Sequence, residues 1–127
     1  KARMKYGVKA PNTEPDDSVS AEDKQAWKRA YRQYVNLVEW TTVTQPVFWT
    51  SAVLTREAFG ASSKQFKIVS YAAALWPLIR LGYGKAYQID AEKRHSYFGA
   101  STMCLLLSLV IGSVSAAKLA RQEFSRK

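Results

Sequence analysis

The chain of 127 residues offers few side chains that could do chemistry, because it contains one histidine and one cysteine. A histidine is a common axial ligand of haem. His95, however, stands beside Arg94 at the start of an apolar stretch rather than within it, so we expect a solvated or headgroup-facing imidazole. Cys104 lies inside the same stretch, where a buried thiol behaves as a small apolar residue. Neither residue predicts a redox centre.

Glu39 and Arg80 are the charged residues closest to the apolar parts of the chain. Ionisable residues inside a membrane are candidates for a functional site. Both stand near the end of an apolar segment, which favours an ion pair between them or a contact with lipid headgroups. One alternative stays open, in which Arg80, Tyr83 and His95 belong to a membrane-anchor subunit that contributes to a quinone or haem site.

Local catalytic motifs are missing from the sequence. It has no glycine-rich phosphate loop, no paired histidine and glutamate at helical spacing and no nucleophile elbow. With one histidine, it has no catalytic triad unless a partner supplies it. A single cysteine excludes an intramolecular disulfide. We therefore predict no catalytic residue, no metal ligand and no cofactor. The chain is predicted not to be an enzyme, although it could be a non-catalytic subunit of an enzyme complex.

Uncharged stretches are the clearest feature of the chain. Tyr97 to Ala117 is 21 residues without a charge. At 1.5 Å per residue, a helix of that length extends about 31 Å, the thickness of the hydrocarbon core of a bilayer. Weaker segments at 40–56 and 68–84 contain Pro46 and Pro77, which membrane helices tolerate. The pattern predicts an all-α membrane protein with about three transmembrane helices, at about 40–56, 68–84 and 97–117.

Two further segments precede the predicted membrane domain at 39–127. Residues 1–19 contain Pro11 and Pro15 and few residues that could be buried, so we expect an extended arm. Residues 20–38 begin with Ser20 followed by acidic residues, which is typical of a helix N-terminus. Their apolar positions recur at helical spacing opposite a basic face. We expect an amphipathic basic helix that lies on a membrane surface.

Small residues recur every four positions along the third predicted span. Membrane helices associate closely where small side chains let two backbones approach. This spacing predicts a helix-packing interface, on which a neighbouring subunit would dock. Its members are Ala100, Cys104, Ser108, Gly112 and Ala116.

The chain is strongly basic, with 19 Lys and Arg against 10 Asp and Glu and a net charge of +9. The basic residues flank the apolar segments instead of gathering on one face with aromatic residues, as nucleic-acid binding would require. We therefore predict anionic lipids as partners and no nucleic acid. The predicted headgroup contacts are Arg56, Arg80, Lys85, Arg94 and Lys118. Tyr83 and Tyr87 lie near a span end and fit an aromatic belt at the membrane interface.

These observations predict a non-catalytic accessory subunit that stabilises a larger membrane complex through helix packing and lipid contacts. The expected setting is the mitochondrial inner membrane, in a respiratory-chain or ATP synthase complex, because a chain that begins with Lys1 fits removal of a presequence. Another organellar or a bacterial energy-transducing membrane is an alternative. A further alternative is a soluble basic binding domain in which residues 40–55 form a strand.

Overall fold

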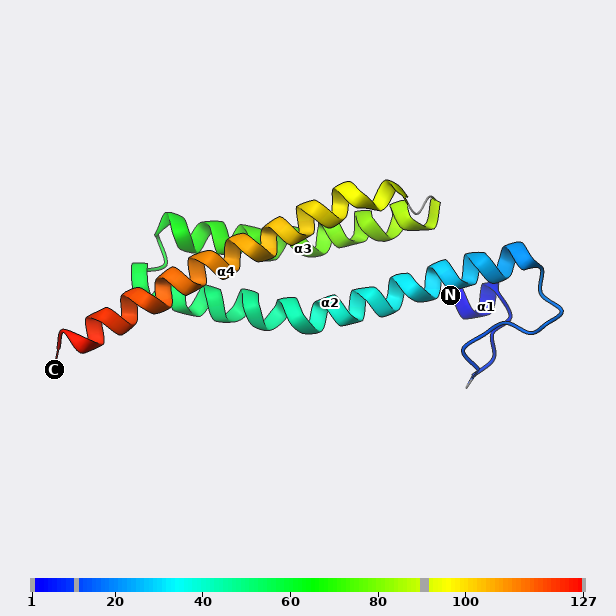
Figure 1. The fold of residues 1–127 in the computed structure, drawn as a ribbon, viewed down its shortest axis with the longest axis horizontal. Helices are drawn as coiled ribbons and strands as arrows, with labels where there is room; N and C mark the ends of the chain where they lie inside the picture. The colour runs from blue at the N-terminus through cyan, green and yellow to red at the C-terminus, as the bar shows by residue number, and fades with distance from the viewer. Residues whose placement is uncertain (1, 11, 90–91, 127) are drawn as a thin grey trace.

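In the computed structural model, three long helices form a bundle, with the two chain termini near opposite ends (Figure 1). The structure describes residues 2–10, 12–89 and 92–126, and these contain no strand. The all-helical part of the predicted fold is therefore confirmed for the described residues. The elements are α1 (Ala2–Lys5), α2 (Ala21–Phe59), α3 (Lys64–Ile89), a short 3₁₀ turn η1 (Glu92–Arg94) and α4 (His95–Phe124).

The helix α2 is continuous over 39 residues. It begins where the Ser20 hydroxyl accepts a hydrogen bond from the Asp23 backbone N–H at 3.1 Å, and it ends at Gly60, whose φ of 87° suits glycine. Pro46 lies within it without ending it. The segments predicted as a surface helix (20–38) and a first span (40–56) are therefore one helix, and no helix end falls between them.

The helices α3 and α4 complete the bundle. Gly60 to Ser63 connect α2 to α3, and the Ser63 hydroxyl accepts a hydrogen bond from the Phe66 backbone N–H at 3.2 Å, which caps α3. Figure 1 shows α4 crossing α3 on its way from the α3–α4 connection to the C-terminal end. Residues from all three helices meet in an apolar cluster of Phe48, Ala72, Trp76 and Cys104.

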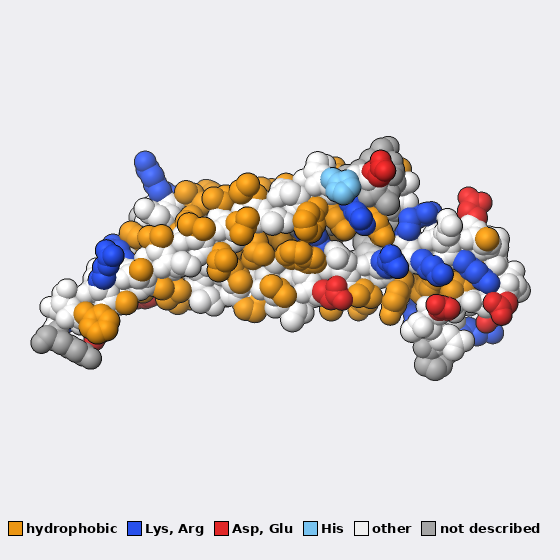
Figure 2. Space-filling view, viewed as in Figure 1, with side chains coloured by type: hydrophobic (Ala, Val, Ile, Leu, Met, Phe, Trp, Pro, Cys, Tyr) orange, Lys and Arg blue, Asp and Glu red, His pale blue; other side chains and the backbone are white. Residues whose placement is uncertain are grey.

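The bundle buries several hydroxyl groups beside its apolar cluster and exposes many large apolar side chains. Thr55 and Ser115 are fully buried, and their hydroxyls are 3.1 Å apart in a hydrogen bond between α2 and α4. Large apolar side chains instead point outward, and Figure 2 shows them covering the middle of the bundle while charged residues gather toward its ends. Exposed examples are Val43, Trp49, Leu75, Leu78, Leu106 and Val110. This distribution is typical of helices that contact lipid.

Among the described residues, α4 is the helix whose length and composition would let it cross a bilayer. It contains the stretch Tyr97–Ala117 that the sequence indicated. Neither α2 nor α3 meets the same criterion. The number of three spans thus stays a prediction.

The N-terminal segment folds back on α2, which differs from the extended arm predicted for residues 1–19. The Trp27 indole N–H donates a hydrogen bond to the Thr13 carbonyl at 3.0 Å, and the Tyr6 ring packs edge-on against Trp27 with centroids 6.1 Å apart. Val8 is buried. A tryptophan carries both a large apolar surface and a hydrogen-bond donor. Here the N-terminal segment covers the apolar surface and accepts the hydrogen bond.

Candidate functional site: a polar pocket between α2 and α3

A polar pocket lies between α2 and α3 near the α3–α4 connection. We call it the α2–α3 pocket, and its volume is about 290 Å³. Its lining residues are Tyr31, Arg32, Gln33, Val35, Asn36 and Glu39 from α2, Tyr83 and Tyr87 from α3, and Arg94 from η1. Helical spacing explains this grouping, because residues three and four positions apart share one face of a helix. Arg32, Asn36 and Glu39 follow that spacing on α2, as do Tyr83 and Tyr87 on α3.

The α3 side of the pocket presents two phenol rings beside a cation. Tyr83 and Tyr87 are one turn apart, and their rings stack with centroids 6.2 Å apart and an interplanar angle of 12°. The guanidinium carbon of Arg94 lies 5.0 Å from the centre of the Tyr87 ring. Such cation–π contacts hold a charged group over an aromatic face. The two tyrosines are mostly buried, so this wall of the pocket is well packed.

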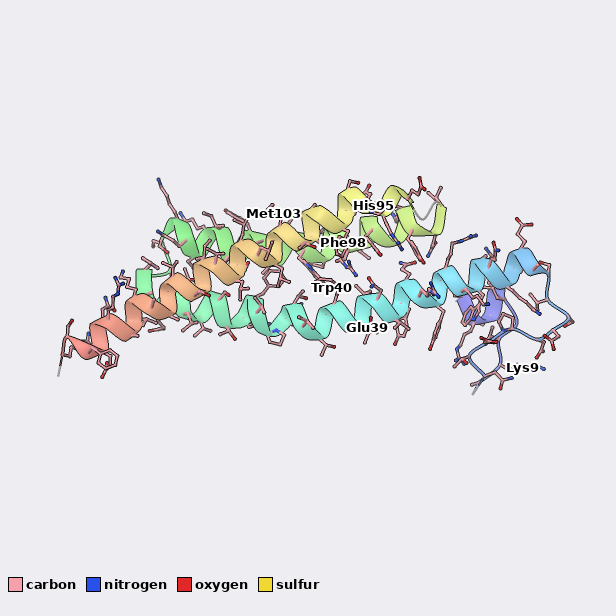
Figure 3. The ribbon with its side chains drawn as sticks, in the orientation of Figure 1. Lys9, Glu39, Trp40, His95, Phe98 and Met103 are labelled. Carbon is pink, nitrogen blue, oxygen red and sulfur yellow. The ribbon has the colours of Figure 1, made fainter. Side chains whose placement is uncertain are left out.

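Arg80 lies behind the pocket and links α3 to α2. Its Nη2 donates to the Asn36 backbone carbonyl at 3.4 Å and also to the Asn36 side-chain oxygen. The guanidinium carbon lies 4.5 Å from the centre of the Tyr83 ring and 5.6 Å from that of Trp40. Figure 3 shows Trp40 between α2 and the other two long helices. Two residues that line the pocket, Asn36 and Tyr83, are therefore held by the same buried cation.

A side-chain contact joins α2 and α3 beside the pocket. The Gln88 side-chain amide donates a hydrogen bond to the Gln33 side-chain oxygen. Gly84 faces Gln33 one turn earlier on α3, and a Cβ at this position would overlap the Gln33 amide. The absence of a side chain at Gly84 thus leaves room for the Gln33 side chain where the two glutamines meet.

The chemistry available in this pocket is that of an anion-binding site with one acidic group. Arg32 and Arg94 can bind carboxylates with paired hydrogen bonds, while Glu39 can accept an ammonium group. Phenol hydroxyls next to cations can stabilise an oxyanion or a thiolate. Among the described residues, no group of three or more His, Cys, Asp and Glu could hold a metal ion. The site therefore suits a small zwitterionic ligand.

The predicted packing ladder on α4 is largely used within the chain. Cys104, Ser108 and Gly112 are buried, Ala116 is partly buried and Ala100 is exposed. A Cβ at Gly112 would lie 2.5 Å from the Ser51 hydroxyl oxygen and 3.1 Å from the Ser51 Cα. The close approach therefore joins α4 to α2. The middle of this face is covered by α2, so a neighbouring subunit could not dock there.

The predicted headgroup residues have different environments. Arg56 and Lys85 are exposed, and Arg94 is partly buried against the pocket. The Lys118 ammonium donates to the Ala58 carbonyl at 2.7 Å. For Arg80 the headgroup prediction is wrong, because its side chain is 4% exposed inside the bundle. Asn36 and the surrounding aromatic rings give this arginine partners there, so it need not extend to the interface.

Of the residues proposed for a quinone or haem site, Arg80 and Tyr83 are in contact, whereas nothing places His95 with them. Arg80 binds Asn36 rather than Glu39, so the expected ion pair is replaced by hydrogen bonds. His95 is exposed. Sequence reasoning missed Asn36 as a site residue, and it treated Arg32 as part of a basic surface and the two tyrosines as an aromatic belt. Polar residues that recur at helical spacing next to the start of an apolar segment could have indicated these site residues.

Comparison with known proteins supplies a family. A protein-family model described as the MAPEG family matches residues 1–114, whereas no curated protein and no solved structure matches the chain. Proteins of that family are integral membrane proteins, known as glutathione transferases and enzymes of eicosanoid and glutathione metabolism. The predicted membrane setting is thereby confirmed.

The same finding overturns two predictions. Members of the matching family are generally enzymes, so the prediction of a non-enzymatic chain is wrong. They are also not subunits of the respiratory chain or of ATP synthase, which contradicts the predicted accessory role. The first error came from equating a lack of local motifs with a lack of catalysis, and the second also from interpreting Lys1 as the product of presequence removal. Because the match extends over residues 1–114 of 127, the chain belongs to the MAPEG family of membrane proteins.

Proposed function

We propose that this chain acts in a glutathione transferase, binding glutathione in the α2–α3 pocket and promoting attack of its thiol on an electrophilic substrate. The observation that carries the proposal is the lining of this pocket, where two arginines, one carboxylate, two side-chain amides and three tyrosines converge. Glutathione is a tripeptide with two carboxylates, one ammonium group and a thiol. Each of these groups has a chemical counterpart in the pocket. Family membership supports the choice of glutathione among zwitterionic ligands.

The charged groups of the pocket would orient the peptide. Arg32 and Arg94 each offer a planar fork of donors that matches a carboxylate. Glu39 would accept the ammonium group, and the Asn36 amide would bond to a peptide group. Binding by opposite charges at separate points fixes the ligand in one orientation. The thiol would then face the tyrosines.

Chemistry would begin with transfer of the thiol proton to water, which leaves the thiolate. A free thiol has a pKa of about 8.5, and a site with positive charge or hydrogen-bond donors favours the thiolate. The hydroxyls of Tyr83 and Tyr87 would donate to it, and Arg94 would add positive charge. The thiolate electron pair would then form a carbon–sulfur bond with the electrophile. A leaving group such as halide departs with the electrons of the bond that breaks.

Binding measurements on the full chain in detergent or nanodiscs test this function. Calorimetry with glutathione should detect binding by the unchanged protein. Arg32→Ala should raise the Kd about ten- to a hundredfold, because a charge-assisted hydrogen bond contributes roughly 1.5–3 kcal/mol. Arg56→Ala is the matched control, since Arg56 is exposed near the other end of α2. Equal Kd values for Arg32→Ala and the unchanged protein would contradict the assignment of this pocket, as would no binding at all.

We further propose that α2 and α3 cross the membrane beside α4. Outward apolar side chains on all three helices and charges toward the ends of the bundle support this arrangement. Single cysteines introduced at Ser18 and Ser62 of a Cys104→Ser protein would test it in sealed vesicles. A membrane-impermeant maleimide should label the two positions from opposite sides. Labelling of both from one side would contradict a crossing by α2.

Contacts with anionic lipids and with other membrane subunits stay proposals. The exposed side chains of Arg56 and Lys85 support lipid contacts, because each extends from an end of the apolar region. Flotation with vesicles that contain or lack phosphatidylserine would test them. The mitochondrial inner membrane stays a prediction for the compartment, and cell fractionation against marker proteins of each membrane would test it.

A further inference from the structure

Arg80 is a buried cation that does not line the α2–α3 pocket. Its side chain is 4% exposed, and its Nε and Nη1 have no hydrogen-bond partner among the described residues. Removing a guanidinium from water is costly unless other groups compensate for it. The compensation here comes from Asn36 and from the rings of Trp40, Trp76 and Tyr83, whose centres lie 4.5–5.8 Å from the guanidinium carbon. Two of these four partners, Asn36 and Tyr83, line the pocket.

We propose that Arg80 is a positioning residue, which orients Asn36 and strengthens the Tyr83 hydroxyl as a hydrogen-bond donor to the thiolate of bound glutathione. This inference rests on the proposed function. It assigns to Arg80 an effect exerted through two neighbours, without contact between its guanidinium and the ligand.

The contact with Asn36 determines which part of that side chain faces the ligand. An amide has one acceptor oxygen and one donor NH₂ group. Because Arg80 carries donors alone, it must face the oxygen, and this identifies the two ends of the amide. The NH₂ group is then directed away from Arg80 and is free to donate. Without Arg80 the amide could rotate, and the pocket would lose a fixed donor.

The contact with Tyr83 acts on the phenol. The guanidinium carbon lies 4.5 Å from the ring centre, the shortest of the three distances from Arg80 to aromatic rings. A positive charge beside the ring draws electron density from the hydroxyl, so the O–H becomes a stronger donor. Burial increases the effect, since water does not screen the charge. A thiolate next to this hydroxyl would be stabilised more than the neutral thiol.

A substitution that removes the charge but keeps the length of the side chain tests the inference. Arg80→Met should raise the apparent pKa of the bound glutathione thiol by about one unit, equivalent to about a tenfold change in the ionisation constant. The thiolate absorbs in the ultraviolet, so difference spectroscopy across a pH series measures this pKa directly. We expect kcat with chlorodinitrobenzene to fall about tenfold as well. Lys85→Met is the matched control, because Lys85 is an exposed cation on the same helix and should leave the thiol pKa unchanged.

The outcomes separate this inference from the proposed function. If the unchanged protein does not bind glutathione, the proposed function is wrong and the inference with it. If it binds glutathione and Arg80→Met leaves the thiol pKa unchanged, the inference is wrong while glutathione binding stands.

A second pair of variants decides the question if Arg80→Met does not fold. Tyr83→Phe retains the ring and removes the hydroxyl, and Arg80→Gln removes the charge but keeps an NH₂ donor for Asn36. Arg80→Gln should raise the thiol pKa when Tyr83 is present and have no further effect in Tyr83→Phe. Equal increases in both backgrounds, or no increase in either, would overturn the inference.

Discussion

Glu39 supplies the carboxylate in the lining of the α2–α3 pocket, and its side chain is exposed. An exposed charge contributes modestly to folding, so replacing it should affect binding more than stability. We expect Glu39→Gln to weaken glutathione binding about tenfold, because it removes the partner of the ammonium group. Calorimetry with glutathione and with its analogue that lacks the amino group measures the effect. The variant should bind the analogue as the unchanged protein does.

Glu57→Gln is the control for this prediction, since Glu57 is an exposed carboxylate near the other end of α2. An equal loss of affinity for both ligands in Glu39→Gln would show that Glu39 does not bind the ammonium group.

Individual site residues were only partly predictable. Arg80 was recognisable as unusual because it interrupts an apolar segment, but its partner could not be read from the sequence. That partner, Asn36, is 44 positions away and meets Arg80 only when α2 and α3 pack together. Arg32 and Tyr87 have ordinary explanations within one helix, as a basic surface and an interfacial aromatic residue. Their convergence in one pocket depends on the tertiary structure.

At the level of the helices, the contact between Gly112 of α4 and Ser51 of α2 determines how closely these elements pack. We expect Gly112→Ala to destabilise the bundle, because the new Cβ would lie 3.1 Å from the Ser51 Cα, a backbone atom that cannot move alone. Overpacking of this kind typically costs about 1–3 kcal/mol. Thermal unfolding in detergent, followed by circular dichroism, should show a lower Tm.

Gly99→Ala provides the matched comparison on the same helix. A Cβ at Gly99 meets no atom within 4 Å, and alanine favours a helix over glycine by up to about 1 kcal/mol. Its Tm should therefore stay unchanged or rise. A Tm for Gly112→Ala equal to that of Gly99→Ala would mean that the α2–α4 contact is not close-packed.

Helix positions were predictable where the sequence contains a signal for an end. Ser20 and Gly60 define the ends of α2 through a cap and a positive φ, and both residue types are recognisable in a sequence. The division at residue 38 had no such basis, since it followed a change in polarity. Glu39 and Trp40 contain nothing that ends a helix, so α2 continues through them. Packing partners were less accessible, because small residues on α4 indicate close contact without identifying the opposing helix.

For the whole molecule, the sequence predicted the membrane environment better than it predicted the activity. A long uncharged stretch requires an apolar environment, and this depends on composition alone. The buried hydroxyls of Thr55 and Ser115, with apolar side chains outside, agree with that environment. The proposed activity instead depends on a pocket assembled from α2, α3 and η1, whose residues form no contiguous motif. A search for local catalytic motifs does not detect a site whose residues come from three separate elements.

The number of membrane crossings is a property of the whole molecule that a substitution on α3 can test. Leu78 is exposed near the middle of this helix, so it would face acyl chains if α3 spans the bilayer. Arginine at the centre of a span costs roughly 2.5–3.5 kcal/mol in insertion. We therefore expect Leu78→Arg to lower the fraction of protein that resists alkaline extraction and to lower its Tm in nanodiscs. Ile89→Arg should leave both unchanged, because the exposed Ile89 is the last residue of α3 and an arginine there can reach the headgroups. Equal behaviour of the two variants would mean that α3 does not cross the membrane.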